Sequence, residues 1–213
     1  MNYKLIAFDM DDTLLSGRTI YVIADRKGFR EEVDRIISMD ITNYRKTIEI
    51  AKLLRGMRVE EFLEIFRSIP LNENVPEVLN EIRKRKIKTA IISNSYDLAA
   101  RDLADRLRID YVIANELVVK DGVITGLVIP HNKKPTDEKG DCRSYSVCKS
   151  EALKEICDKM GIDPSEAIAV GDGSIDRFML STAGLGIAYR PKANLEDYAD
   201  VIIDDMMELL RFL

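Results

Sequence analysis

The sequence predicts an α/β fold: a doubly wound, mainly parallel sheet with helices on both faces, to which a small helical cap and a β-hairpin flap are added. Apolar runs of strand length recur along the chain, and most are separated by amphipathic segments of helical period. Strands that alternate with helices favour parallel pairing, because each crossover helix packs back on the sheet. One long helical stretch and one hairpin signal interrupt this alternation.

The composition is that of a globular protein. Of the 213 residues, 46% are apolar and 32% are charged, which suffices for one core and a smaller subdomain. The net charge of −5 comes from acidic and basic residues mixed throughout, so we do not expect a nucleic-acid partner. No apolar run approaches the roughly 18 residues of a membrane span, and the N-terminus does not resemble a signal peptide. We therefore expect a cytoplasmic protein with no membrane contact.

The cysteines predict neither a zinc site nor a disulfide framework. Cys142, Cys148 and Cys157 form an odd set without paired metal-ligand spacing, and the chain has one histidine. We interpret all three as reduced thiols.

Six apolar runs are expected to form the strands of the sheet. Each is short and bounded by polar residues or glycine, and the runs are 5–8, 89–92, 111–114, 167–170, 186–188 and 201–203.

The stretch between residues 16 and 75 lacks strand signals and is predicted to be a helical insertion. Its apolar residues recur at helical spacing in four groups, which begin at Ile20, Val33, Ile48 and Phe62. Because the insertion follows an acidic segment directly, we expect it to fold over that segment as a lid; a helical layer elsewhere on the sheet is the alternative. The predicted division is a core of residues 1–15 and 76–213 and a cap of residues 16–75.

A hairpin and a loop are predicted in the second half of the chain. Two β-rich runs within 116–127 flank Lys120-Asp121-Gly122, in which Asp-Gly is a strong hairpin signal, so this segment should project as a flap. Residues 130–146 are polar and irregular, and we predict a mobile loop there.

The first strand run leads directly into the acidic segment Asp9-Met10-Asp11-Asp12-Thr13. Ligands of open α/β sheets bind at the carboxyl ends of strands, and residues two apart on extended chain point the same way. Asp9 and Asp11 can therefore converge, one to attack or to hold a cation and the other to transfer protons. A polar turn in which Asp11 or Asp12 caps the next helix is the alternative.

Two later strand ends carry residues suited to an anion and a cation. Ser93-Asn94-Ser95 precedes a helical stretch, where hydroxyl and backbone N–H groups can bind phosphate; a simple helix cap is the alternative. Gly171-Asp172-Gly173-Ser174-Ile175-Asp176 ends another strand and is either a second carboxylate cluster or a plain turn. Mg²⁺ prefers oxygen ligands, which Asp9 and Asp172 could supply.

Lys149 lies near the start of a predicted helix whose expected cap is Ser146. A cation in the first turn opposes the helix dipole, and a bound phosphate would reverse that cost. A solvated lysine remains the alternative.

These segments together resemble the four motifs of the haloacid dehalogenase superfamily of phosphatases. In chain order, the residues that match them are the acidic segment 9–13, Ser93, Lys149 and the segment 171–176. The resemblance spans the chain and implies a Rossmann-like core. Within the superfamily the chain is most similar to phosphoserine phosphatases, through the helical cap, the hairpin 118–126 and the stretch 183–188.

The resemblance implies a Mg²⁺-dependent phosphomonoester hydrolase that acts on a small phosphorylated metabolite. Asp9 would be the nucleophile that forms an aspartyl phosphate, and Asp11 the acid and base. Mg²⁺ would be held by Asp9, Asp172 and the backbone carbonyl of Asp11.

The remaining motif residues have supporting roles in the same scheme. The phosphate would be bound by Ser93, Asn94 and Lys149. Asp176 would support the metal or Lys149, and Thr13 would steady the nucleophile loop.

Three departures from the phosphoserine phosphatase pattern bear on the substrate. Arg18 stands where the family generally has a Glu that receives the amino group, and a cation there would repel ammonium and attract a second anion. Ile175 replaces an Asn of the fourth motif. Ser93-Asn94-Ser95 replaces Ser-Gly-Gly, and the loop before Lys149 is unusually long. We therefore predict that phosphatase chemistry is kept, whereas serine recognition is in question.

Two other functions use the same residue types. A phosphatase or phosphotransferase for another, more anionic phosphate ester would share the nucleophile. A non-enzymatic phospho-receiver module also has strand-end aspartates, a Ser or Thr and a Lys, although receivers are about half this length and lack a helical insertion.

Overall fold

The computed structural model describes residues 3–213 and contains a seven-stranded sheet in the order β4-β3-β2-β1-β5-β6-β7. All neighbouring strands run parallel except β3 and β4. The strands are β1 (Leu5–Phe8), β2 (Lys88–Tyr96), β3 (Tyr111–Lys120), β4 (Val123–Ile129), β5 (Ala167–Gly171), β6 (Leu185–Tyr189) and β7 (Val201–Ile203). All six predicted runs lie in strands, and the predicted fold class is confirmed.

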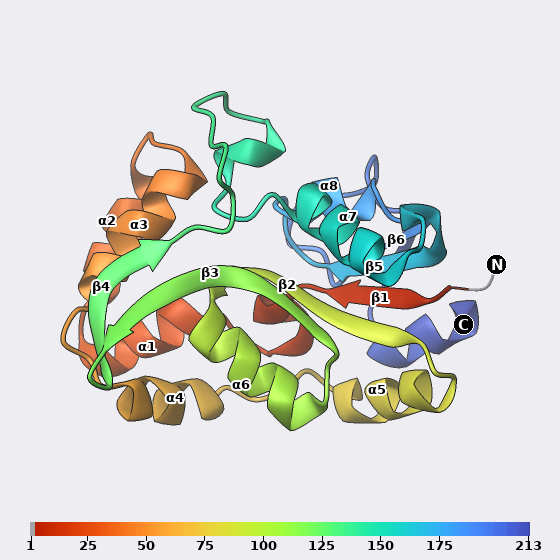
Figure 1. Cartoon of the computed structure of the whole chain (residues 1–213), viewed down its shortest axis with the longest axis horizontal. Coiled ribbons are helices and arrows are strands. Elements are labelled where there is room, and N and C mark those ends of the chain that lie inside the picture. The colour runs from red at the N-terminus through yellow and green to blue at the C-terminus, as the bar shows by residue number, and fades with distance from the viewer. Residues whose placement is uncertain (1–2) are drawn as a thin grey trace.

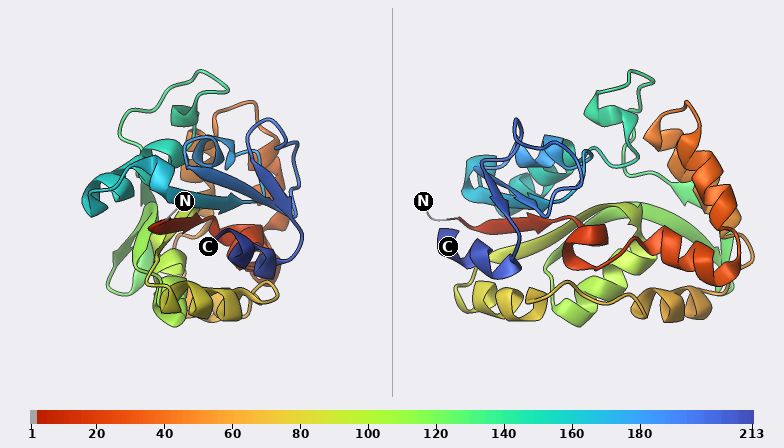
Figure 2. Two further views of the ribbon diagram at one scale, coloured as in Figure 1. Left: turned by 90° about the vertical axis from the view of Figure 1, so that its right-hand side faces the viewer. Right: turned by 180° about the vertical axis from the view of Figure 1, so that it is seen from behind.

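Helices cover both faces of the sheet, as Figures 1 and 2 show. They are α1 (Thr19–Lys27), α2 (Arg30–Ser38), α3 (Asn43–Leu53), α4 (Val59–Arg67), α5 (Val75–Lys84), α6 (Asp97–Leu107), α7 (Lys149–Met160) and α8 (Arg177–Leu180), with a C-terminal 3₁₀ segment Met206–Phe212. In Figure 1, α5 and α6 lie below the sheet and α7 and α8 above it. No helix of residues 3–213 is long and apolar enough to cross a membrane.

The central strand β1 shows why the sheet is buried on both sides. Ile6 and Phe8 belong to the core between the sheet and helices α5 and α6. Leu5 and Ala7 belong to the core on the opposite face, between the sheet and α7. All four side chains are fully buried. Alternate residues of a strand face opposite sides, so an uninterrupted apolar run is what a two-faced core requires.

The insertion after β1 forms four helices, α1 to α4, one for each predicted apolar group. The chain leaves the core and returns to it at one place, because the two connecting segments are hydrogen-bonded. Ser16 N donates to the Pro70 carbonyl at 2.8 Å, and Asn72 N donates to the Leu14 carbonyl at 2.9 Å. This crossing lies beside the acidic segment, so the insertion starts and ends next to the site.

The hairpin forms where the sequence predicts it, but it does not project freely. Asp121 and Gly122 have φ of 52° and 74°, as the tight turn between β3 and β4 requires. Ile124 N donates to the Met57 carbonyl at 2.8 Å, and Gly56 N donates to the Ile124 carbonyl at 2.9 Å. The hairpin therefore joins the cap to the sheet, because β3 is one continuous strand that pairs with β2 and with β4.

The segment 130–146 is irregular, as predicted, yet it has an internal framework. The Asn132 side-chain amide donates to the carbonyls of Arg143 and Tyr145 at 2.8 and 2.9 Å. Cys142 and Cys148 form a disulfide, with Cα atoms 4.9 Å apart, whereas Cys157 is free and buried. The prediction of three reduced thiols is therefore wrong for two of them, because the chain turns back between Cys142 and Cys148 and brings their Cα atoms within bonding range.

Candidate active site

The acidic segment leaves β1 through one irregular helical turn, Met10–Leu14, in which Asp12 has a φ of 61°. Asn72 stabilises this turn, because its side-chain amide donates to the carbonyls of Asp12, Thr13 and Leu15 at 3.2, 2.9 and 3.1 Å. The turn places the carboxylates of Asp9 and Asp11 on the wall of one cavity. Asp9 and Asp11 thus line the same cavity, and their joint action stays a prediction.

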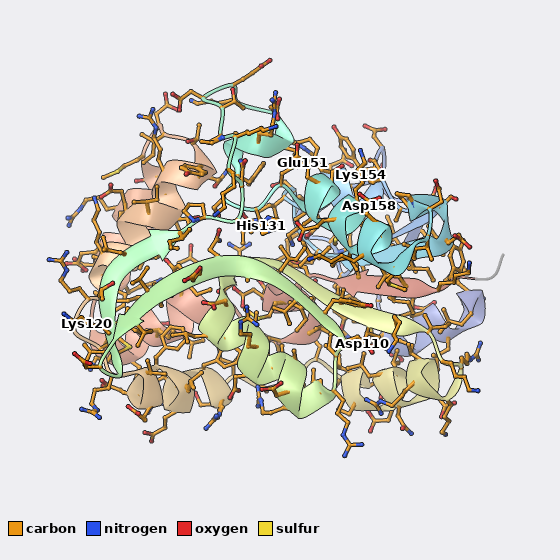
Figure 3. The ribbon with its side chains drawn as sticks, in the orientation of Figure 1. Asp110, Lys120, His131, Glu151, Lys154 and Asp158 are labelled. Carbon is orange, nitrogen blue, oxygen red and sulfur yellow. A yellow bond between two sulfur atoms is a disulfide. The ribbon has the colours of Figure 1, made fainter. Side chains whose placement is uncertain are left out.

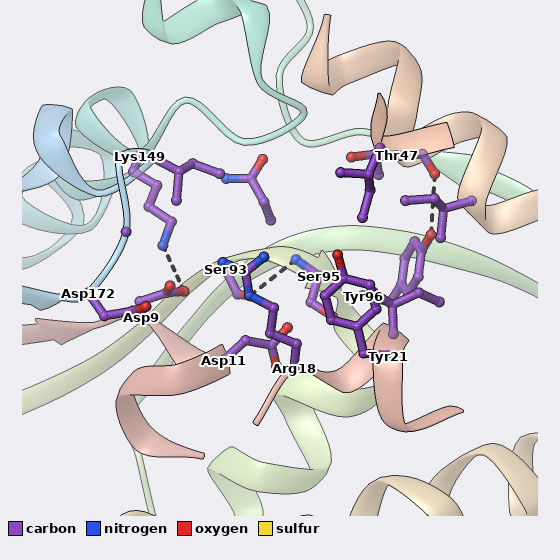
Figure 4. Close-up of a pocket in the computed structure, with 16 residues that line it drawn as sticks. Asp9, Asp11, Arg18, Tyr21, Thr47, Ser93, Ser95, Tyr96, Lys149 and Asp172 are labelled. Carbon is purple, nitrogen blue, oxygen red and sulfur yellow. Dashed lines mark hydrogen bonds and ion pairs between the residues drawn. The ribbon is translucent and has the colours of Figure 1, made fainter. Parts of the chain in front are cut away.

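Lys149 reaches this cavity from the first turn of α7 (Figure 4). Its ammonium lies 2.7 Å from Asp9 Oδ1 and 2.5 Å from Asp176 Oδ1, and only 1% of its side chain is exposed. Burial opposes the charged form, but the charges of Asp176 and Asp9 outweigh that effect and raise the pKa of Lys149. Lys149 is therefore a fixed cation beside Asp9, which rules out the alternative of a solvated lysine.

Asp176 is fully buried, and both of its carboxylate oxygens are bonded. While Oδ1 pairs with Lys149, Oδ2 accepts from the backbone N–H of Asp172 at 3.1 Å and of Gly173 at 2.9 Å. Gly171 leaves room for this carboxylate, since a Cβ there would lie 2.4 Å from Asp176 Cγ. Asp176 thus fixes both Lys149 and the loop that carries Asp172.

Asp172 faces Asp9 across the ends of β5 and β1. Thr13 Oγ1 donates to Asp172 Oδ1 at 3.0 Å, which ties the first motif to the fourth. Asp9, Asp172 and Asp176 each offer a carboxylate oxygen, and these atoms lie within 4.8 Å of one another. Burial, followed by the charge of Asp176, raises the pKa of Asp172 to about 6 and that of Asp9 well above its usual range.

The charges of this cluster fit a divalent cation. Three carboxylates against the single ammonium of Lys149 leave two negative charges when all groups are ionised. Burial makes the largest contribution to the raised pKa values of Asp9 and Asp172, and repulsion between the like charges adds to it. Oδ1 of Asp9 and of Asp172 is bonded to protein, and no described residue is bonded to Oδ2 of either carboxylate. Those two oxygens are available to a hard cation.

Asp11 is held apart from this cluster by the start of α1. Its Oδ1 accepts from the hydroxyl of Thr19 at 2.5 Å and from the Thr19 N–H at 3.1 Å. Burial raises the pKa of Asp11 to about 6, although the bonds from Thr19 oppose the shift. A carboxyl group of this kind can carry or release a proton near neutral pH. Sequence reasoning missed Thr19, which no motif marks.

Ser93 and Asn94 have different surroundings. Ser93 Oγ is buried at the cavity wall and accepts from Ser95 N at 3.1 Å, so its hydroxyl proton is free to be donated. The Asn94 side chain instead pairs with Val147: Oδ1 accepts from Val147 N at 2.9 Å, and Nδ2 donates to Val147 O at 3.1 Å. The polar atoms of the Asn94 side chain thus hold the segment before Lys149, and the phosphate-binding role of Asn94 stays a prediction.

Ser146 belongs to the same network and does not cap α7, contrary to the prediction. Its hydroxyl donates to Asn94 Oδ1 at 2.9 Å, and Thr47 Oγ1 lies 3.0 Å away. The N-cap residue of α7 is Cys148, so Lys149 is the first residue of the helix. A single polar network thus connects β2, the cap helix α3 and the segment before Lys149.

The cavity has a volume of about 210 Å³ and is bounded by both the core and the insertion. Motif residues Asp9, Ser93 and Lys149 form one end (Figure 4). Residues of α1, α2 and α3 line the rest, together with Arg18 and Ile175. The insertion therefore covers the acidic segment, and the alternative of a helical layer elsewhere on the sheet is wrong.

Comparison with known proteins gives the family. The family model described as hydrolase, haloacid dehalogenase-like hydrolase, matches residues 3–184. The chain belongs to the haloacid dehalogenase-like hydrolases. The phosphoserine phosphatase of Methanocaldococcus jannaschii is 32% identical over 99% of this chain and 97% of its own length. That of Wolinella succinogenes is 31% identical over 99% of this chain and 100% of its own.

Solved structures agree with this family. A phospho-aspartyl intermediate analogue of phosphoserine phosphatase is 32% identical, with a TM-score of 0.83 and full coverage of both chains. A substrate-bound phosphoserine phosphatase complex is 31% identical, with a TM-score of 0.82, and is matched over 100% of this chain and 99% of its own. The chain is therefore a phosphoserine phosphatase-like phosphatase of the haloacid dehalogenase-like family, and the receiver-module alternative is excluded. Phosphatases of this family use a divalent metal.

Proposed function

We propose that this phosphatase cleaves a small phosphate monoester through an aspartyl phosphate on Asp9, with Asp11 as the acid and base. The observation that carries the proposal is the placement of Lys149, buried and 2.7 Å from Asp9, in the cavity that Asp11 and Ser93 also line. A carboxylate nucleophile beside a fixed cation can approach an anionic phosphate, because the cation offsets the repulsion between them.

In the first half of the reaction, a carboxylate oxygen of Asp9 attacks phosphorus. The new P–O bond forms as the ester P–O bond breaks, and the departing alkoxide takes a proton from Asp11. In the second half, Asp11 removes a proton from water, whose oxygen attacks the same phosphorus and releases inorganic phosphate. The carboxylate of Asp9 and the acid form of Asp11 are restored.

Ser93 and Lys149 are the proposed phosphate ligands. The Ser93 hydroxyl proton has no protein acceptor in the described part of the chain, and the Lys149 ammonium has one donor position beyond Asp9 and Asp176. Both groups can donate to phosphoryl oxygens as these gain charge. Asp176 and Thr13 act on the reaction only by positioning Lys149 and Asp172.

Mg²⁺ is the proposed metal, with Asp9, Asp172 and the backbone carbonyl of Asp11 as its protein ligands. The uncompensated charge of the carboxylate cluster and its two available oxygens support an oxygen-seeking divalent cation. When bound, Mg²⁺ would neutralise charge between the nucleophile and the phosphate. Asp176 is not proposed as a ligand, because both of its oxygens are bonded to protein.

The test is phosphate release from p-nitrophenyl phosphate with and without Mg²⁺. We expect turnover that requires the metal and that Asp9→Asn abolishes. Asp158→Asn is the matched control, because Asp158 is an exposed residue of α7 (Figure 3) and is not among the residues that line the cavity. Turnover by Asp9→Asn at the wild-type rate, or no release from any of a broad set of phosphate esters, would refute the proposal.

A further inference from the structure

The catalytic cavity has two chemically different ends. One end carries the charged motif residues. Most of the remaining lining is apolar or aromatic and comes from Ile20, Tyr21, Ile37, Ile50 and Tyr96, with Thr47 and Ser95 among them. Figure 4 shows the rings of Tyr21 and Tyr96 at the opposite side of the cavity from Lys149 and Asp9. An ester whose phosphorus lies at Asp9 must place its organic part against this apolar wall.

Among the residues that the structure describes, the apolar wall has no carboxylate that could pair with an ammonium group. The acidic residues that line the cavity are Asp9, Asp11 and Asp172, and all three belong to the motif end. The Tyr96 hydroxyl donates to the Thr47 carbonyl at 3.2 Å, so it is already engaged. An amino group transferred from water to such a wall would lose hydration without gaining a counter-charge, which is costly.

Arg18 lines the cavity beside this wall, with its guanidinium carbon 6.0 Å from the centroid of the Tyr21 ring. Its Nε pairs with Asp12 Oδ2 at 2.9 Å, and Asp12 Oδ1 pairs with Lys192 Nζ at 2.8 Å. One carboxylate thus stands between two cations, so Arg18 shares its partner Asp12 with Lys192. The Arg18 side chain is 48% exposed, so the guanidinium keeps donors for a further anion.

We propose that the substrate is a phosphorylated hydroxy acid: a phosphate monoester whose organic part is aromatic or branched aliphatic and bears a carboxylate, but no ammonium. This inference rests on the phosphatase function proposed above. Apolar side chains bury the body of the substrate, and Arg18 pairs with its carboxylate. The cavity of about 210 Å³ limits the body to a small metabolite.

Two matched pairs of esters test the proposal on the wild-type protein. Phosphoserine is compared with 3-phosphooxypropanoate, which lacks only the amino group, and phenyl phosphate with 4-carboxyphenyl phosphate, which adds only the carboxylate. We expect kcat/KM to be about tenfold higher for 4-carboxyphenyl phosphate than for phenyl phosphate, the scale of one charge-assisted hydrogen bond. We also expect it to be about tenfold higher for 3-phosphooxypropanoate than for phosphoserine, because the first ester has no ammonium group to desolvate.

Each variant is judged by the ratio of the kcat/KM values of the two esters in a pair. A general loss of activity lowers both values and leaves this ratio unchanged. Arg18→Met removes the charge and keeps an apolar stem, and it should reduce the preference for the carboxylated ester to about twofold or less. Arg18→Glu supplies a carboxylate for ammonium and should raise phosphoserine relative to 3-phosphooxypropanoate. Arg35→Met on α2, outside the cavity, should keep the wild-type ratios.

The outcomes separate this inference from the proposed function. Turnover of p-nitrophenyl phosphate together with a preference for phosphoserine over 3-phosphooxypropanoate would overturn the inference and leave the phosphatase mechanism intact. An unchanged carboxylate preference in Arg18→Met would also overturn it. No turnover of any ester would refute the mechanism and the inference with it. If an Arg18 variant does not fold, the ratios that the wild-type protein gives for the two pairs of esters still test the inference.

Discussion

Replacement of Asn94 by alanine should destabilise the protein, because the side chain joins two parts of the active site that are distant in sequence. Asn94 follows Ser93 at the end of β2, and its amide pairs with both backbone groups of Val147, two residues before Lys149. Its Oδ1 also accepts from the Ser146 hydroxyl. The alanine variant removes all three hydrogen bonds and leaves the backbone of a fully buried residue, Val147, without partners.

The magnitude follows from these contacts. Each hydrogen bond contributes about 1 kcal/mol net, and a buried N–H left without a partner costs about 1 to 3 kcal/mol. We expect the free energy of unfolding to fall by about 3 kcal/mol for Asn94→Ala. In a protein of this size that loss lowers the melting temperature by roughly 10 °C.

Urea unfolding with a matched control measures this effect. Asn80→Ala, at an exposed position of α5, should change the free energy of unfolding by less than about 0.5 kcal/mol. Inhibition of turnover by inorganic phosphate is measured on Asn94→Ala and Asn80→Ala, at a temperature at which both variants are folded. Wild-type stability of Asn94→Ala combined with a roughly tenfold weaker inhibition by phosphate would refute the reasoning, because that result is expected of a side chain that binds phosphate directly.

Three further predictions concern the same site. Lys149→Met should lower kcat/KM for p-nitrophenyl phosphate by about a hundredfold or more, because it removes the buried ammonium beside Asp9. Lys154→Met, at an exposed position of the same helix, should leave kcat/KM unchanged, and equal effects of the two substitutions would contradict the role of Lys149. Removal of the metal by a chelator should abolish turnover. Asp172→Asn should raise the Mg²⁺ concentration for half-maximal activity by about tenfold or more. Wild-type metal dependence in Asp172→Asn would exclude Asp172 as a ligand. Reduction of the bond between Cys142 and Cys148 should lower the free energy of unfolding by about 2 kcal/mol in the loop-entropy account, measured by urea unfolding with and without dithiothreitol; a protein in which both cysteines are serine should not respond to the reductant.

The two parts of the third departure from the phosphoserine phosphatase pattern are linked in the structure. Asn94 stands where that pattern has Gly, and the loop before Lys149 is unusually long. In the structure, the Asn94 amide is bonded to the end of that loop, at Val147. A glycine could not make these bonds, so the longer loop and the larger side chain fit each other.

The positions of the strands and of the acidic residues could be read from the sequence. The run Leu5–Phe8 is apolar at every position because β1 is buried on both faces, and the same holds for Ala167–Gly171 in β5. Parallel strands place their carboxyl ends at one edge of a sheet, so residues that follow these runs must meet. Asp9 and Asp172 could be assigned to one site for that reason.

Tertiary structure alone decided how those residues are used. Thr19 and Asp11, Thr13 and Asp172, and Asn94 and Val147 are hydrogen-bonded pairs that no local pattern marks. The disulfide between Cys142 and Cys148 likewise depends on the path of a loop.

The sequence by itself determined the fold class, the helical insertion and the carboxylates of the site, because burial and periodicity act on neighbouring residues. The structure decided which oxygen bonds to which donor, and which wall the insertion turns toward the phosphate. Those outcomes depend on contacts between segments far apart in the chain, such as Thr13 and Asp172, which are separated by 159 positions. The periodicity of a sequence reports only on neighbouring residues. The distance between segments that are far apart in the chain is therefore decided by how the chain packs.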